Sequence, residues 1–231
     1  MVDIGYAAKS LWRLFFPKCC TVCGKGLSDG EQYLCIGCIN AMPRVKMRNG
    51  IMEDVEMLFA GSRVVESAVA YFMYNRHGSY SEILKDIKYH NRPQVGQYLA
   101  SHFSRELIAT GFFDGVDMVV PVPLYRKKME KRGYNQSSYI ADGVSAISGI
   151  PVVAAVVAVK PHNSQTSRSV DERMRNVAGV FAVDADVAGK RVLLVDDVIT
   201  TGATLSACCD VLRQAGASGV RILSLALAES I

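Results

Sequence analysis

The chain has 231 residues, of which 50% are hydrophobic, and it carries 26 Lys and Arg residues against 22 Asp and Glu residues. This length suits one mid-sized domain or one domain with a small module, and the apolar content can bury a large core. The net charge of +4 neither demands nor excludes a polyanionic partner. The longest apolar stretches, such as Val152 to Val159, fall far short of the roughly 20 residues that span a bilayer. We therefore expect a cytoplasmic globular protein with no transmembrane segment.

The first expected element is an N-terminal helix over residues 1–18. Its sequence is apolar, but Lys9 and Arg13 interrupt it and no small-residue cleavage site follows, which disfavours a signal peptide. We expect a docking helix with an aromatic core face. A peripheral position at the inner face of a membrane stays open, because three aromatic residues would also suit a membrane surface: Trp12, Phe15 and Phe16.

The cysteine spacing predicts a zinc ribbon over residues 19–42. Two C-x2-C pairs lie eleven residues apart, and together they offer the four sulfur ligands that tetrahedral Zn2+ prefers. Disulfides are the alternative, which the missing secretory signal disfavours. Because the protein would fill all four positions, the zinc would be structural, and Cys19 is left without a role. The predicted ligands are Cys20, Cys23, Cys35 and Cys38.

The sequence of the next part of the chain predicts one or two strands followed by two helices. A connecting stretch rich in Met and charge runs from Pro43 to about Gly61, and one or two strands then end near Asn75. Ser79 to His90 has apolar residues on one helical face, and Pro93 opens another helix, which suits Pro at a first helical position.

Four later segments are near-continuous apolar runs rich in Val and Ile. Such runs are typical of strands buried on both faces of a parallel sheet. Helical patterns lie between several of them, over Asn135 to Ser148 and over Ala203 to Ala215. Alternating strands and helices indicate a doubly wound α/β domain. The expected strands are Val116 to Pro123, Val152 to Lys160, Arg191 to Asp197 and Arg221 to Leu227.

Two adjacent carboxylates, Asp196 and Asp197, end the third of these strands, and Thr200-Thr201-Gly202-Ala203-Thr204 then opens a helix. Ligands of open α/β sheets bind beyond the carboxyl ends of the strands. The first N–H groups of a helix form an anion site, to which Thr hydroxyls add hydrogen bonds, and Gly202 would let the backbone approach a phosphate closely. The segment therefore fits a ribose 5-phosphate, whose hydroxyls, or a nearby Mg2+, would relieve the repulsion between the carboxylates.

Val192 to Thr204 resembles the fingerprint of the type I phosphoribosyltransferases, the loop that binds 5-phosphoribosyl 1-pyrophosphate (PRPP). The alternative is an N-capped helix after a strand with two solvated Asp residues, which would not need both carboxylates and three Thr residues. The resemblance implies that Asp196 and Asp197 are catalytic residues that hold the ribose. It also implies a loop that binds PRPP, formed by Val198, Thr200, Thr201, Gly202, Ala203 and Thr204.

Two more segments, Val119 to Gln136 and Gln165 to Phe181, together with the four-Cys module, resemble the ComF-like phosphoribosyltransferases, which are linked to competence and DNA uptake. The resemblance runs from Phe16 to Ala226. It implies a type I phosphoribosyltransferase fold, an α/β fold with a mostly parallel sheet flanked by helices, over residues 62–231. A hood for the acceptor is expected at about residues 62–113.

The same resemblance adds residues outside the Asp-Asp loop to the PRPP site. The turn at Pro121 and Val122 would face the pyrophosphate, and Arg132 would contact the ligand. A mobile lid over Lys160 to Asn176 would add Lys160, Gln165 and Arg173. Two positions depart from the family pattern, because Arg168 replaces an apolar residue and Lys160 stands where an Arg is usual.

The sequence therefore predicts an Mg2+-dependent phosphoribosyltransferase that moves ribose 5-phosphate from PRPP to an unknown acceptor. The alternative is a non-catalytic protein of the same fold that binds single-stranded DNA, with basic residues and two Tyr residues forming a groove. In a third interpretation, the zinc ribbon binds a protein partner or only caps the sheet of its own chain. Competence proteins and a second copy of the chain stay open as partners.

Overall fold

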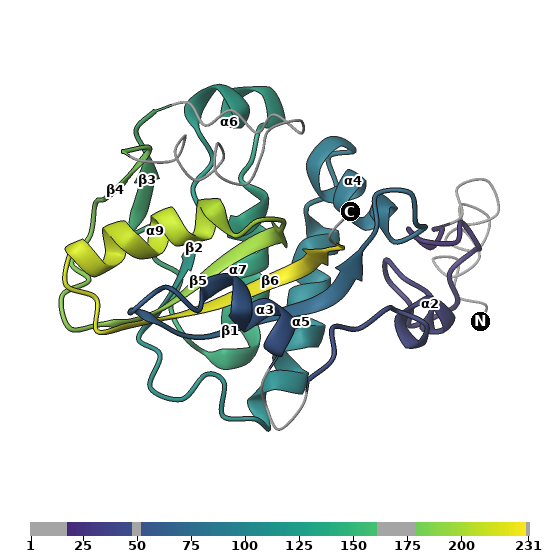
Figure 1. The fold of residues 1–231 in the computed structure, drawn as a ribbon. Coiled ribbons are helices and arrows are strands. Elements are labelled where there is room, and N and C mark those ends of the chain that lie inside the picture. The colour runs from purple at the N-terminus through teal and green to yellow at the C-terminus, as the bar shows by residue number, and fades with distance from the viewer. Residues whose placement is uncertain (1–17, 48–51, 161–178, 230–231) are drawn as a thin grey trace, which may run out of the picture.

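The computed structural model describes residues 18–47, 52–160 and 179–229. The expected N-terminal helix, except Lys18, lies outside these residues. The described part contains a parallel sheet, a two-stranded ribbon and helices on both sides of the sheet (Figure 1). The described helices are α2 (Ile36–Asn40), α3 (Glu53–Glu56), the 3-10 helix η1 (Met57–Phe59), α4 (Ser81–Tyr89), α5 (Gln94–Ile108), α6 (Arg126–Arg132), α7 (Gln136–Ser148) and α9 (Ala203–Gln214).

The central sheet has four strands in the order β1-β6-β5-β2, and every neighbouring pair is parallel. Its carboxyl edge brings Pro121 beside Val195 and Asp196 beside Ser224. The Asp pair therefore lies at the edge of an open sheet where ligands usually bind, as the sequence predicted. The strands are β1 (Val65–Tyr74), β2 (Met118–Pro121), β5 (Arg191–Ile199) and β6 (Gly219–Ala228).

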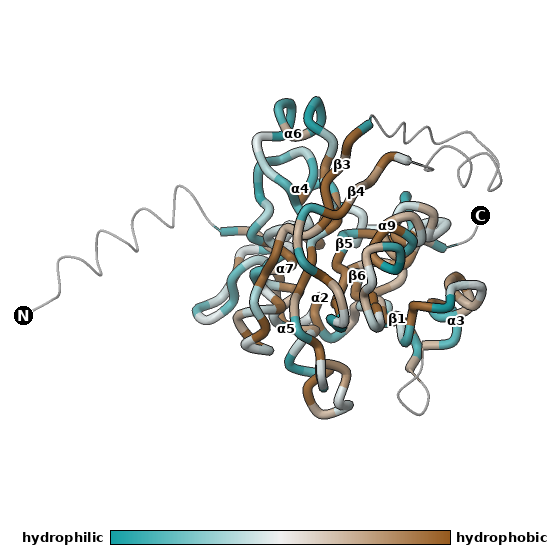
Figure 2. Tube along the Cα trace, turned by 90° about the vertical axis from the view of Figure 1, so that its left-hand side faces the viewer, coloured by the Kyte–Doolittle hydropathy of each residue, from teal (hydrophilic) through white to brown (hydrophobic). Residues whose placement is uncertain are grey.

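The apolar runs are buried because helices cover both faces of the sheet. Residues Val192 to Val195 of β5 are each 0% exposed, as expected for a strand with no solvent face. In Figure 1, α9 crosses one face while α7 and α5 lie behind the other. Figure 2 shows hydrophobic stretches through the middle of the molecule and hydrophilic residues at α6. None of the helices in the described part of the chain is long and apolar enough to cross a membrane.

The prediction of a parallel strand over Val152 to Lys160 was wrong for most of that segment. Only Val152 pairs with the sheet, through a parallel bridge to Val119. The next bond in that ladder would need an N–H group at Pro121, which proline lacks, so pairing stops there. A bond from the Ala155 N–H to the Val153 carbonyl (2.8 Å) then turns the chain away. It continues as β3 (Val156–Ala158), which pairs antiparallel with β4 (Phe181–Val183).

The segment that follows the four-Cys module packs closely on the domain. Arg44 forms an antiparallel bridge with Phe72 of β1, and Met73 donates its N–H to the Pro43 carbonyl (2.7 Å). Val55 and Phe59, from α3 and η1, are buried in the same core. The described part of the expected connecting stretch is therefore an integral layer beside β1.

Candidate functional site

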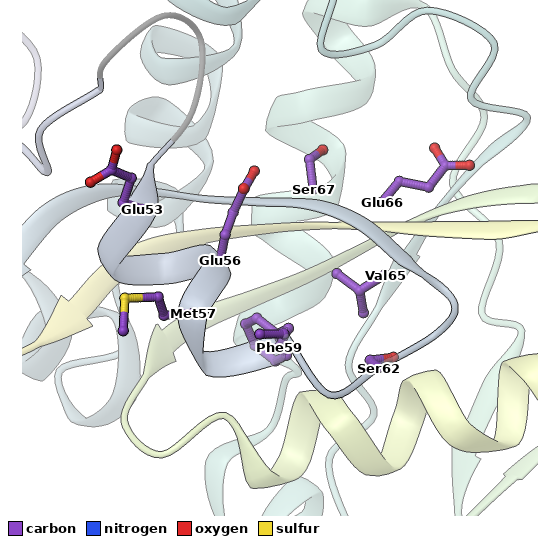
Figure 3. A pocket seen from close by; sticks show the side chains of 9 residues that line it. Glu53, Glu56, Met57, Phe59, Ser62, Val65, Glu66 and Ser67 are labelled. Carbon is purple, nitrogen blue, oxygen red and sulfur yellow. The ribbon is translucent and has the colours of Figure 1, made fainter.

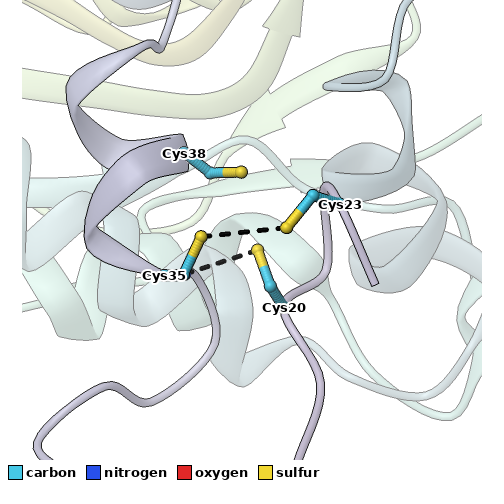
Figure 4. A group of neighbouring side chains, drawn as sticks. All are labelled: Cys20, Cys23, Cys35 and Cys38. Atoms are coloured by element: carbon cyan, nitrogen blue, oxygen red, sulfur yellow. Dashed lines mark hydrogen bonds between the residues drawn. The ribbon is translucent and has the colours of Figure 1, made fainter. Parts of the chain in front are cut away.

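The four predicted zinc ligands lie together in one cluster (Figure 4). The sulfur atoms of Cys20, Cys23, Cys35 and Cys38 all lie within 4.8 Å of one another. A Zn–S distance of about 2.3 Å gives a tetrahedron with sulfur–sulfur edges of about 3.8 Å. The Cys23 and Cys35 sulfurs are 3.8 Å apart, so this cluster fits a tetrahedral metal ion.

The environment of the thiols also fits a cation. Burial alone would raise the pKa of Cys20, but hydrogen bonds from backbone N–H groups lower it to about 7. One of these is donated by the Cys35 N–H to the Cys20 sulfur, at 3.4 Å. Burial and the neighbouring thiols raise the pKa of Cys38 instead. The cluster thus stabilises one thiolate and resists further negative charge, which a divalent metal ion would neutralise.

Strand β5 continues two residues beyond the expected end at Asp197, so the Asp pair lies near its carboxyl end, where Asp196 has donors from the protein. The Ser137 hydroxyl donates to Oδ1 of Asp196 at 2.9 Å, and the Asp197 backbone N–H donates to the same oxygen at 2.9 Å. Burial, and then the charge of Asp197, raise the pKa of Asp196 to about 7, although Lys88 and these hydrogen bonds act against the rise. Near neutral pH this carboxyl group is therefore poised between its charged and neutral forms.

Asp197 is 2% exposed, and one cation faces it. The ammonium of Lys88, on α4, lies 3.0 Å from Oδ1 of Asp197. The other oxygen, Oδ2, is buried without a hydrogen-bond partner among the described residues. Burial alone would lower the pKa of Lys88, but Asp197 and Asp196 raise it above its ordinary value. An unpaired buried acceptor costs about 1–3 kcal/mol, so this edge retains capacity for a donor or a cation.

Sequence reasoning missed Lys88 and Ser137. A Lys residue in an amphipathic helix is usually solvated, but Lys88 follows Leu84 and Ser81 at intervals of four and seven. Both of those side chains are buried, so helical periodicity already placed Lys88 at the margin of the buried face. Ser137 lies in the first turn of α7 and is 0% exposed, which its polar character did not suggest.

The turn after the Asp pair opens helix α9, as the sequence predicted. Gly202 has a φ of 73°, and the first N–H groups of α9, which follows, have no acceptor within the helix. A Cβ atom on Gly202 would lie 3.2 Å from the ring of Phe59. Gly is therefore required both by the left-handed backbone and by the packing of η1. Thr200 is exposed, and Thr201 and Thr204 are partly buried at this helix start.

The predicted turn at Pro121 and Val122 lies beside the Asp pair. Val122 donates its N–H to the Val195 carbonyl at 2.9 Å, and its own carbonyl accepts from the Asn135 side chain at 3.0 Å. The Asn135 oxygen also caps α7 by accepting the Ser137 N–H. The link between β2 and α7 is thereby tied to the carboxyl edge of the sheet.

Three cations influence one another beside this edge. Burial, then Arg132 and Lys88, lower the pKa of Lys128. Arg132 donates to the Gln136 side chain, and its guanidinium lies 5.8 Å from the centre of the Tyr89 ring. Arg132 and Lys88 therefore place positive charge beside Lys128, which favours an anion there.

The remaining predicted residues lie in or next to the 161–178 segment. Lys160 is exposed, and its N–H donates to the Val180 carbonyl at 3.4 Å. Gln165, Arg168 and Arg173, with the rest of the expected lid, lie outside the described residues.

A separate hollow of about 400 Å3 lies between α3, η1 and the amino-terminal end of β1 (Figure 3). Its carboxylates include Glu53, Glu56 and Glu66, and only Glu66 has ion pairs with arginines, Arg191 and Arg221, among the described residues. An acidic hollow disfavours a phosphorylated ligand, which makes the carboxyl edge the better anion site.

Comparison with known proteins matches residues 130–230 to the family described as the phosphoribosyl transferase domain. Competence protein F of Haemophilus influenzae is 34% identical over 48% of this chain and 51% of its own length. DNA utilization protein YhgH of Escherichia coli K12 is 27% identical over 63% of this chain and 66% of its length. Competence protein ComFC of Bacillus subtilis is 22% identical over 89% of this chain and 84% of its length. The chain thus spans about half to two thirds of the first two relatives.

Among solved structures, the match to the glutamine PRPP amidotransferase of B. subtilis covers 58% of this chain and 26% of the amidotransferase chain. The sequence identity is 23% and the TM-score is 0.41. A structure titled adenine phosphoribosyltransferase covers 63% of this chain and 75% of its own, at 18% identity and a TM-score of 0.39. The domain match over residues 130–230, the named relatives, the parallel sheet and the four-Cys cluster together support a ComF-like family of proteins with a phosphoribosyltransferase-type domain.

Proposed function

We propose that the protein binds PRPP with Mg2+ at the carboxyl edge of its sheet and transfers ribose 5-phosphate to an acceptor of unknown identity. The observation that carries this proposal is the Asp pair. Asp197 has a buried oxygen without a partner among the described residues, and Asp196 has a pKa raised to about 7 by burial and by Asp197. Both carboxylates therefore gain when ribose hydroxyls donate to them or a cation binds beside them.

In this reaction the acceptor attacks C1 of the ribose while the bond between C1 and the pyrophosphate oxygen breaks, and pyrophosphate leaves with the bonding electrons. Asp196 and Asp197 would accept hydrogen bonds from the ribose hydroxyls and orient C1. The N–H groups and hydroxyls between Thr200 and Thr204 would hold the 5-phosphate. A bound Mg2+ would supply charge to the pyrophosphate, and Arg132 would add to it as the leaving group develops charge.

Calorimetric titration of PRPP with Mg2+ tests the binding step. We expect Asp196→Asn combined with Asp197→Asn to abolish binding while the fold is retained. The matched control is Asp184→Asn combined with Asp186→Asn, which removes the same charge from two exposed residues. Equal affinity in the wild type and the first double variant would refute the proposed role. Release of pyrophosphate on addition of candidate nucleobases and amines would then identify the acceptor.

A second candidate function is the binding of single-stranded DNA. Relatives are named competence and DNA utilization proteins. The segment from Arg126 to Arg132 holds five cations against one carboxylate, Glu130, which pairs with Arg126 at 2.8 Å. Tyr134 and Tyr139 form an edge-to-face pair just after it. Aromatic rings beside cations are the usual platform for unpaired bases.

Fluorescence anisotropy with a labelled oligothymidine tests this second function. We expect affinity to fall as salt rises, and Lys127→Ala with Lys131→Ala to reduce the salt slope by about 1–2 counterions. Affinity that is independent of salt would exclude binding through the phosphates.

We also infer a cytoplasmic location, because a cluster of reduced thiols persists in a reducing compartment. Attachment to a membrane surface and formation of a homodimer are further proposals. Co-sedimentation with anionic vesicles and light scattering at several protein concentrations would test them.

A further inference from the structure

Helix α4 lies between the four-Cys module and the Asp pair, and the module bonds to the amino-terminal end and to the carboxyl-terminal half of the helix. At the amino-terminal end, the Tyr80 hydroxyl donates to the Cys38 carbonyl at 2.8 Å. Further along, the Thr21 hydroxyl donates to Oδ2 of Asp86 at 3.0 Å. Cys38 is one of the clustered thiol residues, and Thr21 lies in the turn between Cys20 and Cys23. The module thus contacts α4 through the same short turns that carry its sulfur atoms.

Asp86 is the centre of this contact. It is 6% exposed and has three partners, which are Thr21, the His90 ring nitrogen Nδ1 at 2.8 Å and the Arg92 guanidinium at 2.7 Å. A buried carboxylate with this number of partners holds its neighbours in a narrow range of positions. His90 and Arg92 follow α4 in the chain, so among these three partners Thr21 is the one that ties the carboxyl-terminal half of α4 to the module.

The opposite face of the same half-turn reaches the Asp pair. Residues two apart on a helix are separated by about 200° around the axis and by about 3 Å along it. Asp86 thus faces the module while Lys88 faces away, with its ammonium 3.0 Å from Asp197. A second bond, from the Tyr134 hydroxyl to the Ile87 carbonyl at 2.7 Å, ties this half-turn to the segment before α7. A small rotation of α4 on the module would therefore move Lys88.

We propose that the four-Cys module positions Lys88 against Asp197, and that Thr21 and Asp86 are positioning residues for the Asp pair. The module acts on the candidate site through α4 and not through direct contact with a ligand. Loss of the Thr21–Asp86 bond frees α4 to rotate, and Lys88 then withdraws from Asp197. Loss of the metal from the thiols has the same effect, because it releases the turn that carries Thr21.

The first test measures Lys88 without any ligand, so it does not depend on the proposed function. Limited acetylation of the folded, zinc-loaded protein is followed by mass spectrometry, and labelling of Lys88 is expressed relative to Lys85 on the same helix. Lys88 has a side chain that is 21% exposed and paired with Asp197, whereas the Lys85 side chain is 47% exposed. We expect Thr21→Val to raise the ratio about threefold, which corresponds to the lower end of the range for the net contribution of one hydrogen bond.

Two other variants complete the test. Thr110→Val is the matched control, because the Thr110 hydroxyl donates to the Leu107 carbonyl at the end of the preceding helix, α5, and we expect it to leave the ratio unchanged. Asp86→Asn keeps the shape of the side chain and should raise the ratio further. If Asp86→Asn does not fold, Thr21→Val alone decides the matter. An unchanged Lys88 ratio in folded Thr21→Val, measured against Thr110→Val, would overturn the proposal.

The second test rests on the proposed function and measures PRPP affinity by calorimetry. We expect Thr21→Val to change the affinity by about threefold while Thr110→Val leaves it at the wild-type value. If wild-type protein does not bind PRPP, the proposed function fails, but the labelling result still decides whether the module positions Lys88. If PRPP binds and Lys88 labelling responds while the affinity does not, the module positions the helix without serving the site, which overturns the role of Thr21 and Asp86 as positioning residues.

Discussion

Replacing Asp196 with Asn should stabilise the free protein although it removes a residue of the candidate site. Burial and the adjacent Asp197 raise the pKa of Asp196 from 3.8 to about 7. A difference of about three pKa units corresponds to roughly 4 kcal/mol of unfavourable free energy when the carboxylate is charged. Asn keeps an oxygen that can accept from the Ser137 hydroxyl and from the Asp197 N–H, as the carboxylate does now. We expect Asp196→Asn to raise the free energy of unfolding at pH 8 by about 1–4 kcal/mol.

The sign of the pH dependence follows from the direction of the shift. Between pH 4 and pH 7 the folded protein binds a proton at Asp196 that the unfolded chain has released, so wild-type stability falls as the pH rises through this window. Above pH 7 the contribution is constant and unfavourable. The variant lacks this group, so its advantage over the wild type should grow from pH 4 to pH 7 and then level off. Contributions from titrating groups that do not interact with Asp196 cancel in the difference between the two proteins.

Urea unfolding of zinc-loaded wild type and variant at several pH values measures this effect. Asp210→Asn, at an exposed position on α9, is the control and should change the free energy of unfolding by no more than about 0.5 kcal/mol. A variant that is less stable than the wild type at pH 8, or a difference that does not vary between pH 4 and pH 7, would refute the reasoning about burial and charge.

Three further predictions concern the neighbouring residues. Lys88→Met leaves the buried carboxylate of Asp197 without its cation, so it should lower the free energy of unfolding at pH 8 by about 3 kcal/mol in urea. A change below about 0.5 kcal/mol would contradict the buried ion pair. Gly202→Ala should lower the free energy of unfolding by about 1–2 kcal/mol, because φ at this residue is 73° and a Cβ atom would lie 3.2 Å from the Phe59 ring. An unchanged melting temperature would exclude this strain. Elemental analysis should find one zinc ion per chain in the wild type and less than half a zinc ion per chain in Cys38→Ser. Wild-type protein without metal would contradict the metal site.

The sequence predicted the parallel sheet well because its strands are buried on both faces. Continuous apolar runs such as Val192 to Val195 arise when helices cover both sides, and few other structures need them. The segment from Val152 to Lys160 has the same composition but leaves the sheet, because Pro121 on the neighbouring strand cannot continue the ladder. The composition of a segment does not show whether the neighbouring strand can continue the hydrogen bonds, so it could not predict where this segment leaves the sheet.

The candidate site was predictable where its residues are adjacent in sequence. Asp196 and Asp197 with the following Thr-Thr-Gly form one local motif, and the two C-x2-C pairs form another. Lys88 reaches the site only through the tertiary placement of α4, across more than a hundred residues of chain. Helical periodicity places Lys88 at the margin of the buried face of α4, but no pattern in the sequence indicates which residue its ammonium meets. The hydrogen bond between Thr21 and Asp86 could not be predicted from the sequence for the same reason.

Binding of PRPP tests the central claim most directly. In a titration of PRPP and Mg2+ into zinc-loaded protein, we expect micromolar affinity that is lost in the Asp196→Asn, Asp197→Asn double variant and kept in the Asp184→Asn, Asp186→Asn control. Absence of binding to folded wild type, or equal binding by both double variants, would contradict the assignment of the carboxyl edge as a PRPP site.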